Sequence, residues 1–265
     1  MSKLFEELHH SHTSLGELIL RRRRHVGLEA EVYEVKLGDD FLMSSLFTAS
    51  EEALGRLGVQ HARGNRAAGA DRGAGGDRDA AGNRAAADLD VVVGGLGLGY
   101  TAAAVLESAA VRSLLVVEYL EPVIDWHRRG MLPVSATLTG DERCRIVSAD
   151  FFACAFSDPG FDPGQPGRRF DAVLSDIDHS PDAWLDPANN SLYRVQGLER
   201  LTQHLLPGGV FGLWSNDPPD GDFRRRMAAV FAAEWAEPVV FQNPLQDTEV
   251  TQTVYIGLSG GEHAG

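Results

Sequence analysis

The clearest pattern in the chain is a series of short apolar runs between Leu89 and Leu258, separated by helix-prone segments. Short apolar runs bounded by turn signals are typical of buried strands. Their alternation with helices predicts an α/β fold with a doubly wound, mostly parallel sheet of seven strands. The expected strands are residues 89–93, 114–117, 145–148, 170–175, 210–214, 239–241 and 253–258, and the expected helices are residues 101–108, 122–130, 195–205 and 223–234.

The region before this pattern has a different character. Residues 15–45 contain short runs of alternating polarity, which predict a small β-meander. Ser50, followed by Glu51 and Glu52, predicts the capped start of a helix. We therefore expect residues 1–60 to form a small N-terminal β segment with a connecting helix.

A six-residue repeat separates the two regions. Residues 65–88 read NRAAGA, DRGAGG, DRDAAG and NRAAAD, and each repeat opens with Asn or Asp followed by Arg. The repeats offer no large aliphatic side chain for a stacked core, so they predict a disordered insertion over residues 61–88 with a weak helical tendency. The catalytic α/β domain is then expected over residues 89–260.

The overall charge narrows the choice of partner. The formal net charge of the 265 residues is −14, which disfavours nucleic acid because binding its phosphates needs a basic face. An acidic protein is better suited to a small cationic substrate. Two cysteines, no apolar run that could span a bilayer and no signal-peptide core predict a cytoplasmic protein without membrane contact.

A glycine loop follows the first strand of the α/β pattern. The stretch DVVVGGLGLG at residues 90–99 carries Gly95, Gly97 and Gly99 at alternate positions. Residues without a Cβ allow a sharp turn off a buried strand and let a ligand approach bare backbone. The helix-prone residues that follow would aim their first amides at that ligand. The loop therefore predicts a nucleoside site.

The residues around the loop narrow the class of nucleoside. Glu118 ends the next strand about 20 residues on, where an acid is expected to bond ribose hydroxyls. Tyr100 occupies the place of the third glycine of the dinucleotide fingerprint, and no lysine closes the loop as in ATPases. The pattern is typical of proteins that bind an adenosyl sulfonium, either S-adenosylmethionine or its decarboxylated relative.

Further acidic residues follow the next strands. Asp150 could accept the adenine amine or simply cap the helix that follows it. Asp176, Asp178 and His179 follow the strand FDAVLS within four residues, and this density of titratable groups makes them the catalytic candidates. The alternative is that these residues provide turns and caps.

Two groups of residues contain side chains that could bind a metal. Asp176, Asp178 and His179, with Asp217 nearby, could bind a divalent ion, and the acidic loop over residues 217–222 could instead hold a cationic substrate tail or be solvated. The second group, His9, His10 and His12, is expected to be solvated, as is the arginine run over residues 21–24. We expect no metal.

These motifs together resemble one family. GGLGLG, the VVE ending at Glu118, the SAD ending at Asp150, FDAVLSDIDHSP and LYRVQGLERLTQHLLPGGVF resemble the core of the spermidine synthases, the polyamine aminopropyltransferases. The resemblance covers about residues 89–214 and, more weakly, the N-terminal β segment with TASEEAL. It implies a class I methyltransferase-like sheet, Glu118 on the ribose, Asp150 near the adenine, and Asp176 or Asp178 as the carboxylate that handles the attacking amine.

The resemblance also implies a reaction and leaves alternatives. The implied reaction is transfer of an aminopropyl group from decarboxylated S-adenosylmethionine to an amine, by a homodimer paired through its N-terminal β segments. Members of the family usually carry an aspartate in the glycine loop that recognises the aminopropyl amine, whereas this loop offers only Leu96, Gly97 and Leu98. That difference favours a methyltransferase acting with ordinary S-adenosylmethionine on a small acceptor. A non-catalytic nucleoside-binding protein is the third interpretation.

Overall fold

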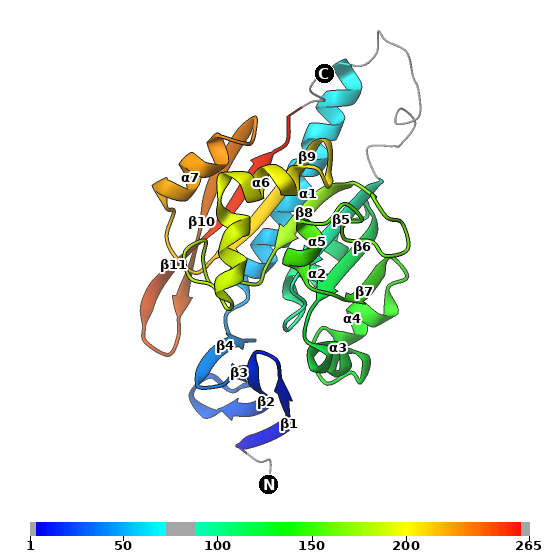
Figure 1. Cartoon of the computed structure of the whole chain (residues 1–265). Coiled ribbons are helices and arrows are strands. Elements are labelled where there is room, and N and C mark those ends of the chain that lie inside the picture. Colours follow the sequence, from blue (N-terminus) through cyan, green and yellow to red (C-terminus); the bar gives the residue numbers. More distant parts are fainter. Residues whose placement is uncertain (1–3, 73–87, 261–265) are drawn as a thin grey trace.

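The computed structural model describes residues 4–72 and 88–260 (Figure 1). Its larger sheet has seven strands in the order β10-β11-β9-β8-β5-β6-β7. Their bounds are β5 (Leu89–Gly94), β6 (Val111–Glu118), β7 (Cys144–Ser148), β8 (Phe170–Ser175), β9 (Leu205–Ser215), β10 (Ala233–Asn243) and β11 (Thr248–Leu258). Strands β5 to β9 pair in parallel, and β11 runs antiparallel to both β9 and β10. This topology confirms the predicted class I methyltransferase-like fold.

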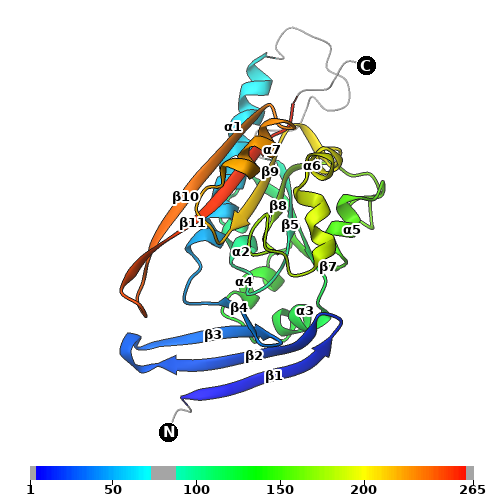
Figure 2. The same ribbon diagram turned by 60° about the vertical axis from the view of Figure 1, so that its left-hand side comes forward.

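Both faces of this sheet are covered by helices (Figures 1 and 2). On β5, Val91 and Val93 belong to one buried cluster and Val92 to the other, because successive side chains of a strand point to opposite faces. The first cluster includes residues of α1 and α3, and the second includes residues of α5, α6 and α7. The bounds are α1 (Ala49–Arg72), α2 (Tyr100–Leu106), α3 (Glu121–Arg128), α4 (Ser135–Gly140), α5 (Phe151–Ala155), α6 (Val195–Thr202) and α7 (Gly221–Ala228), with 3-10 turns η1 (Val26–Leu28) and η2 (Pro187–Tyr193).

The end of the sheet differs from the expected element bounds. Helix α7 ends at Ala228 rather than at Glu234, and Glu234 lies in β10, where it pairs with Gly257. Strands β10 and β11 pair continuously from Ala233 to Asn243 as one long hairpin. Cross-strand pairing over this length overrides the helical tendency of the sequence, since such pairing is a tertiary effect that local propensity does not report.

The N-terminal region forms a second sheet, antiparallel, in the order β1-β2-β3-β4. The predicted meander is present as β2 (Gly16–His25), β3 (Ala30–Leu37) and β4 (Asp40–Ser44). The sequence did not predict its first strand, β1 (Phe5–Thr13), because FEELHHSHT shows no alternation of apolar and polar residues. This sheet lies below the α/β domain, at the end of the molecule that also carries α3 and α4 (Figure 2).

Helix α1 connects the two sheets and continues across the expected boundary at residue 61. It ends at Arg72, and residues 73–87 of the six-residue repeats lie outside the described residues. Ser50 does not cap this helix as predicted. Its side chain is buried and instead bonds Gln252, while the indole Nε1 of Trp214 donates to its hydroxyl at 2.9 Å. The buried contacts to β9 and β11 determine the place of Ser50.

Within residues 4–72 and 88–260, no helix is both long and apolar enough to cross a membrane. The longest described helix, α1, is continuous, but it carries acidic side chains in its first turn and further polar side chains along its length.

Candidate functional site

The glycine loop after β5 packs directly against the end of β8. Gly95, Gly97 and Gly99 all have positive φ, at 87°, 47° and 93°, a region that side chains rarely adopt. A Cβ on Gly95 would lie 2.1 Å from the carbonyl oxygen of Asp176. The amide of Asp176 donates to the carbonyl of Gly94 at 2.8 Å. The loop therefore needs glycine at these positions for its own geometry, whatever ligand it binds.

Glu118, the last residue of β6, contacts this loop through its side chain. One carboxylate oxygen accepts a hydrogen bond from the Leu96 amide at 2.8 Å, and the other accepts one from the Leu120 amide at 2.7 Å. Burial raises the pKa of Glu118, although these amide bonds favour its charged form and act in the opposite direction. Its carboxylate thus holds the backbone of the loop and at the same time lines the cavity beside it.

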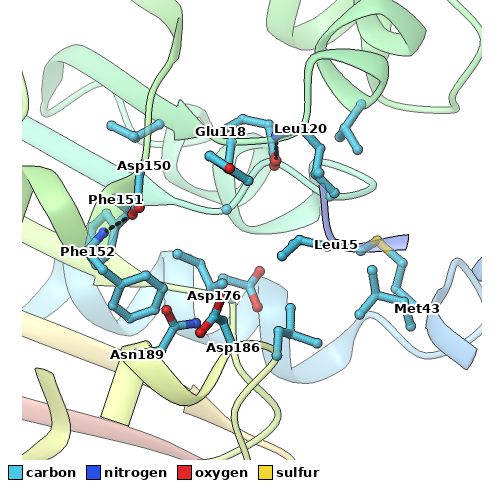
Figure 3. Close-up of a pocket in the computed structure, with 18 residues that line it drawn as sticks. Leu15, Met43, Glu118, Leu120, Asp150, Phe151, Phe152, Asp176, Asp186 and Asn189 are labelled. Atoms are coloured by element: carbon cyan, nitrogen blue, oxygen red, sulfur yellow. Dashed lines mark hydrogen bonds between the residues drawn. The ribbon is translucent and has the colours of Figure 1, made fainter. Parts of the chain in front are cut away.

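A cavity of about 170 Å³ lies at the carboxyl ends of the parallel strands (Figure 3). One side, the strand-end wall, is formed by Gly95, Gly97, Val117, Glu118, Asp176 and Ile177. A second group of lining residues, the hairpin wall, consists of Leu15, Leu42 and Met43 from the N-terminal sheet and its first turn. The remaining lining residues are Tyr119, Leu120, Val123, Asp150, Phe151, Phe152, Leu185, Asp186 and Asn189.

Asp150 caps the helix that follows it, as one of its two interpretations predicts. Its Oδ1 accepts hydrogen bonds from the amides of Phe152 at 2.8 Å and Ala153 at 3.1 Å, so it caps α5. Asp150 is also exposed and lines the cavity beside Phe151 and Phe152. Capping uses Oδ1, and the structure places the residue where a ligand in the cavity could reach it (Figure 3).

Asp176 is the predicted catalytic residue that reaches the cavity. It follows β8, lies half-buried in the strand-end wall, and its Oδ2 accepts a hydrogen bond from the Thr101 hydroxyl at 2.6 Å. Burial raises the pKa of Asp176, and the Thr101 hydroxyl lowers it in part. A carboxylate whose pKa is raised towards neutrality is suited to accept a proton from a bound substrate.

Glu51 is a second carboxylate close to Asp176 that the sequence indicated only as part of a helix start. Burial raises the pKa of Glu51, and the negative charge of Asp176 raises it further. Thr101 connects the two residues, since its hydroxyl also lies 3.1 Å from the Glu51 carbonyl oxygen. Within the described part of the chain, neither carboxylate forms an ion pair with a basic side chain.

Asp178 and His179, the other two catalytic candidates, do not line the cavity. Asp178 is buried and accepts hydrogen bonds from three donors: the Leu185 amide at 2.7 Å, the Asn189 side chain at 3.0 Å and the Tyr193 hydroxyl at 2.8 Å. Burial raises the pKa of Asp178, and these three bonds oppose that effect. His179 is half-buried, and its carbonyl accepts from the Asn216 amide at 2.7 Å.

The acidic loop after β9 also lies away from the cavity lining. Asp220 caps α7 by accepting from the amides of Asp222 and Phe223, at 3.1 and 2.8 Å. Its own amide donates to the Tyr255 hydroxyl. Asp217 does not join Asp176, Asp178 and His179 in a group with the spacing of metal ligands, as judged over the residues that the structure describes.

Several lining residues could not be found from the sequence. Asp186 and Asn189 lie in the stretch after β8 that carries no motif. Leu15, Leu42 and Met43 are ordinary apolar residues of a meander, and only the packing of the N-terminal sheet brings them to the cavity. A signal was present for Glu51, since two adjacent acids follow Ser50, but helix starts commonly carry acids.

Comparison with known proteins supports the fold. No family model matches the chain, and no curated protein matches its sequence. Among solved structures, spermidine synthase from Thermotoga maritima superposes with a TM-score of 0.65 at 16% identity, over 97% of this chain and 74% of that one. A spermidine synthase in complex with the transition state analogue AdoDATO gives 0.64 at 15% identity, over 97% and 73%. A probable spermidine synthase from Corynebacterium glutamicum ATCC 13032 gives 0.56 at 15%, over 96% and 79%. At these identities the similarity shows a shared fold that includes the N-terminal sheet.

Proposed function

We propose that this protein is a transferase that moves an aminopropyl group from decarboxylated S-adenosylmethionine to an amine. The donor would lie in the cavity that the strand-end wall and the hairpin wall enclose. The proposal is supported by the glycine loop, by the acid at the end of β6, by a fold shared with spermidine synthases, and above all by the charges in the cavity.

The nucleoside half of the donor matches one end of the cavity. Glu118 lies at the base of the glycine loop, where its carboxylate oxygens could also accept hydrogen bonds from ribose hydroxyls. Leu120, Phe151 and Phe152 provide apolar surface for a flat adenine, and Asp150 stands beside them as an acceptor for its amine. Apolar walls with a few placed polar groups are typical of small-molecule sites.

The sign of the charges in the cavity is the observation that carries the proposal. All four charged residues among the described lining residues are acidic: Glu118, Asp150, Asp176 and Asp186. Decarboxylated S-adenosylmethionine ends in an ammonium group, which these acids would attract. Ordinary S-adenosylmethionine also carries a carboxylate, which would face like charges without a basic side chain in the lining.

The residues at Asp176 suit the chemistry of this transfer. A neutral amine attacks the carbon next to the sulfonium, a C–N bond forms, the C–S bond breaks, and its electron pair stays on sulfur to give neutral methylthioadenosine. The amine nitrogen loses a proton, which the Asp176 carboxylate can accept. Glu51 lies close by, and burial together with the negative charge of Asp176 raises its pKa to about 8, so this carboxyl keeps its proton near neutral pH and leaves Asp176 as the proton acceptor. Positioning of the two reactants supplies the rest of the rate enhancement.

A methyltransferase acting with ordinary S-adenosylmethionine is the second candidate. The observation that favours it is the glycine loop itself. The side chains of Leu96 and Leu98 are 3% and 5% exposed and pack in the core, so the loop supplies no acid to the tail of the donor. A non-catalytic nucleoside-binding protein would require that Asp176 be dispensable.

Calorimetric binding of the two donors tests the proposal directly. Decarboxylated S-adenosylmethionine and S-adenosylmethionine are titrated separately, with methylthioadenosine as a control for the shared nucleoside. We expect the decarboxylated donor to bind at least about tenfold more tightly, a difference of about 1.4 kcal/mol. Preference for S-adenosylmethionine would support the methyltransferase, and binding of none of the three would contradict a nucleoside site.

Transfer itself requires a second measurement. The decarboxylated donor is incubated with a panel of linear diamines, and formation of methylthioadenosine is followed with time. Tight donor binding without methylthioadenosine in any reaction would favour the non-catalytic alternative. A cytoplasmic location and a homodimer stay predictions.

A further inference from the structure

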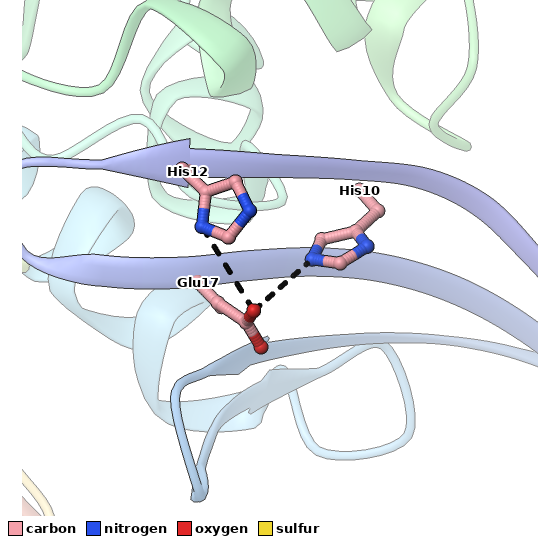
Figure 4. A group of neighbouring side chains, drawn as sticks. All are labelled: His10, His12 and Glu17. Carbon is pink, nitrogen blue, oxygen red and sulfur yellow. Dashed lines mark ion pairs between the residues drawn. The ribbon is translucent and has the colours of Figure 1, made fainter.

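Two histidines and a glutamate lie together on the β1–β2 hairpin, outside the cavity (Figure 4). His10 and His12 are two residues apart on β1, so both side chains point to the same face of the strand. Glu17 on β2 is the register partner of His12, and opposite residues of an antiparallel pair share a face. The hairpin register therefore brings three potential metal ligands to one place.

The spacing of the three side chains is suited to a metal. His10 Nε2 and His12 Nδ1 each lie 3.8 Å from Glu17 Oε1, and one ligand atom from each residue lies within 4.8 Å of the others. Zinc binds nitrogen and oxygen at about 2.0–2.2 Å, so its tetrahedral ligands stand roughly 3.4 Å apart. The side chains of His10, His12 and Glu17 are 40%, 80% and 52% exposed, so solvent surrounds much of each and a metal ion can reach them.

We propose that His10, His12 and Glu17 bind a divalent transition metal with the ligand preference of zinc. Two imidazoles and one carboxylate form a zinc ligand set that leaves a fourth position for water. Over the described residues, the two imidazoles form no other hydrogen bond or ion pair. An exposed ion pair contributes little to stability by itself, so the structural role of the group is small without a metal. The proposal does not depend on the proposed function.

The position of the site connects it to the hairpin wall. The turn between the two strands consists of Ser14 and Leu15, next to the paired ends Thr13 and Gly16. Leu15 lines the cavity, and the Ser14 hydroxyl donates to the hydroxyl of Tyr119 at 3.1 Å. A metal held by both strands would crosslink the hairpin close to this turn. It would therefore restrict the motion of the part of the hairpin wall that the turn supplies.

Zinc titration of the full chain tests the site. The protein is first treated with a chelator, and ZnCl2 is then titrated in a calorimeter. We expect the unchanged chain to bind one Zn²⁺. In His12→Gln the affinity for Zn²⁺ should be at least about tenfold lower, because removing a ligand should weaken binding at least as much as removing the hydrogen-bond partner of a ligand. His25→Gln, at the far end of β2, is the matched control and should bind like the unchanged chain. Equal affinity in His12→Gln, or no binding by the unchanged chain, would overturn the site.

Amide hydrogen exchange then tests the link to the turn. We expect Zn²⁺ to slow exchange over residues 13–17 in the unchanged chain and to leave it unaltered in His12→Gln. Exchange that Zn²⁺ does not alter in the unchanged chain would show that the metal does not stabilise the hairpin. Neither measurement uses the nucleoside, so failure of the metal site and failure of the proposed transferase remain distinguishable.

Discussion

The two walls of the cavity differ in origin and in chemistry. The strand-end wall comes from the carboxyl ends of parallel strands and carries Glu118 and Asp176 on a backbone with two positive-φ glycines, Gly95 and Gly97. The hairpin wall comes from a separate antiparallel sheet and contributes Leu15, Leu42 and Met43. One wall thus supplies carboxylates, whereas the other supplies apolar surface.

The difference between the walls predicts separate roles for them in the proposed reaction, one in the chemical step and one in binding. Charged groups act more strongly where water is excluded, so the apolar hairpin wall strengthens the electrostatics of the strand-end wall. Changes in the strand-end wall should therefore affect the chemical step, and changes in the hairpin wall should affect binding. Substitutions in each wall, and beside it, test this division.

Substitution Asp176→Asn should have the largest effect. Asparagine keeps the size of the side chain but cannot take the proton of the attacking amine, so turnover should fall by about 100-fold or more. Binding of methylthioadenosine, measured by calorimetry, should change little. Unaltered turnover would remove Asp176 from the mechanism, and loss of both turnover and binding would show that the residue is needed to form the wall itself.

Substitution Asp178→Ala should affect stability instead. It leaves the donors of Leu185, Asn189 and Tyr193 without their acceptor, which should lower the free energy of unfolding by about 3 kcal/mol. Denaturant unfolding measures this loss. The folded fraction should keep turnover within severalfold of the unchanged protein, because Asp178 does not line the cavity. A large loss of turnover without a change in the free energy of unfolding would indicate that Asp178 is catalytic after all.

Substitution Met43→Ala tests the hairpin wall. Met43 is half-buried in the cavity and approaches Gly97, where its sulfur would lie 3.0 Å from an added Cβ. Removing this apolar surface should weaken methylthioadenosine binding by about tenfold, or about 1.4 kcal/mol. Turnover at saturating substrate should remain. A fall in turnover without a change in binding would mean that the hairpin wall acts on the chemical step.

Substitution Thr101→Val should give the smallest change, a shift in pH dependence. The proposed reaction requires ionised Asp176, so the rate should fall as pH drops through its pKa, which burial raises above the ordinary value. The Thr101 hydroxyl lowers this pKa, so its removal should move the acid limb of kcat/KM to higher pH, by less than about one unit. Thr101→Ser, which keeps the hydroxyl, is the control. A shift to lower pH would contradict the assignment of the limb to Asp176.

The α/β core and the glycine loop after β5 could be predicted from the sequence alone. Apolar runs with the length of strands, alternating with helices, leave few ways to bury both faces of a sheet. Gly95, Gly97 and Gly99 were predictable because glycine adopts a positive φ far more readily than other residues, and at Gly95 a Cβ would also meet the Asp176 carbonyl oxygen. Glu118 was predictable because it follows a strand at a fixed spacing. These signals are local, so they can be found without knowing which segments meet.

Which acids line the cavity depends on the tertiary structure. Asp176 and Asp178 are two residues apart in one motif, yet one lines the cavity and the other is enclosed by donors from the stretch that follows β8. The approach of Glu51 to Asp176, and the place of Met43 in the cavity, depend on how the N-terminal sheet and α1 pack on the α/β domain. Such contacts join residues far apart in the chain, and no local pattern encodes them.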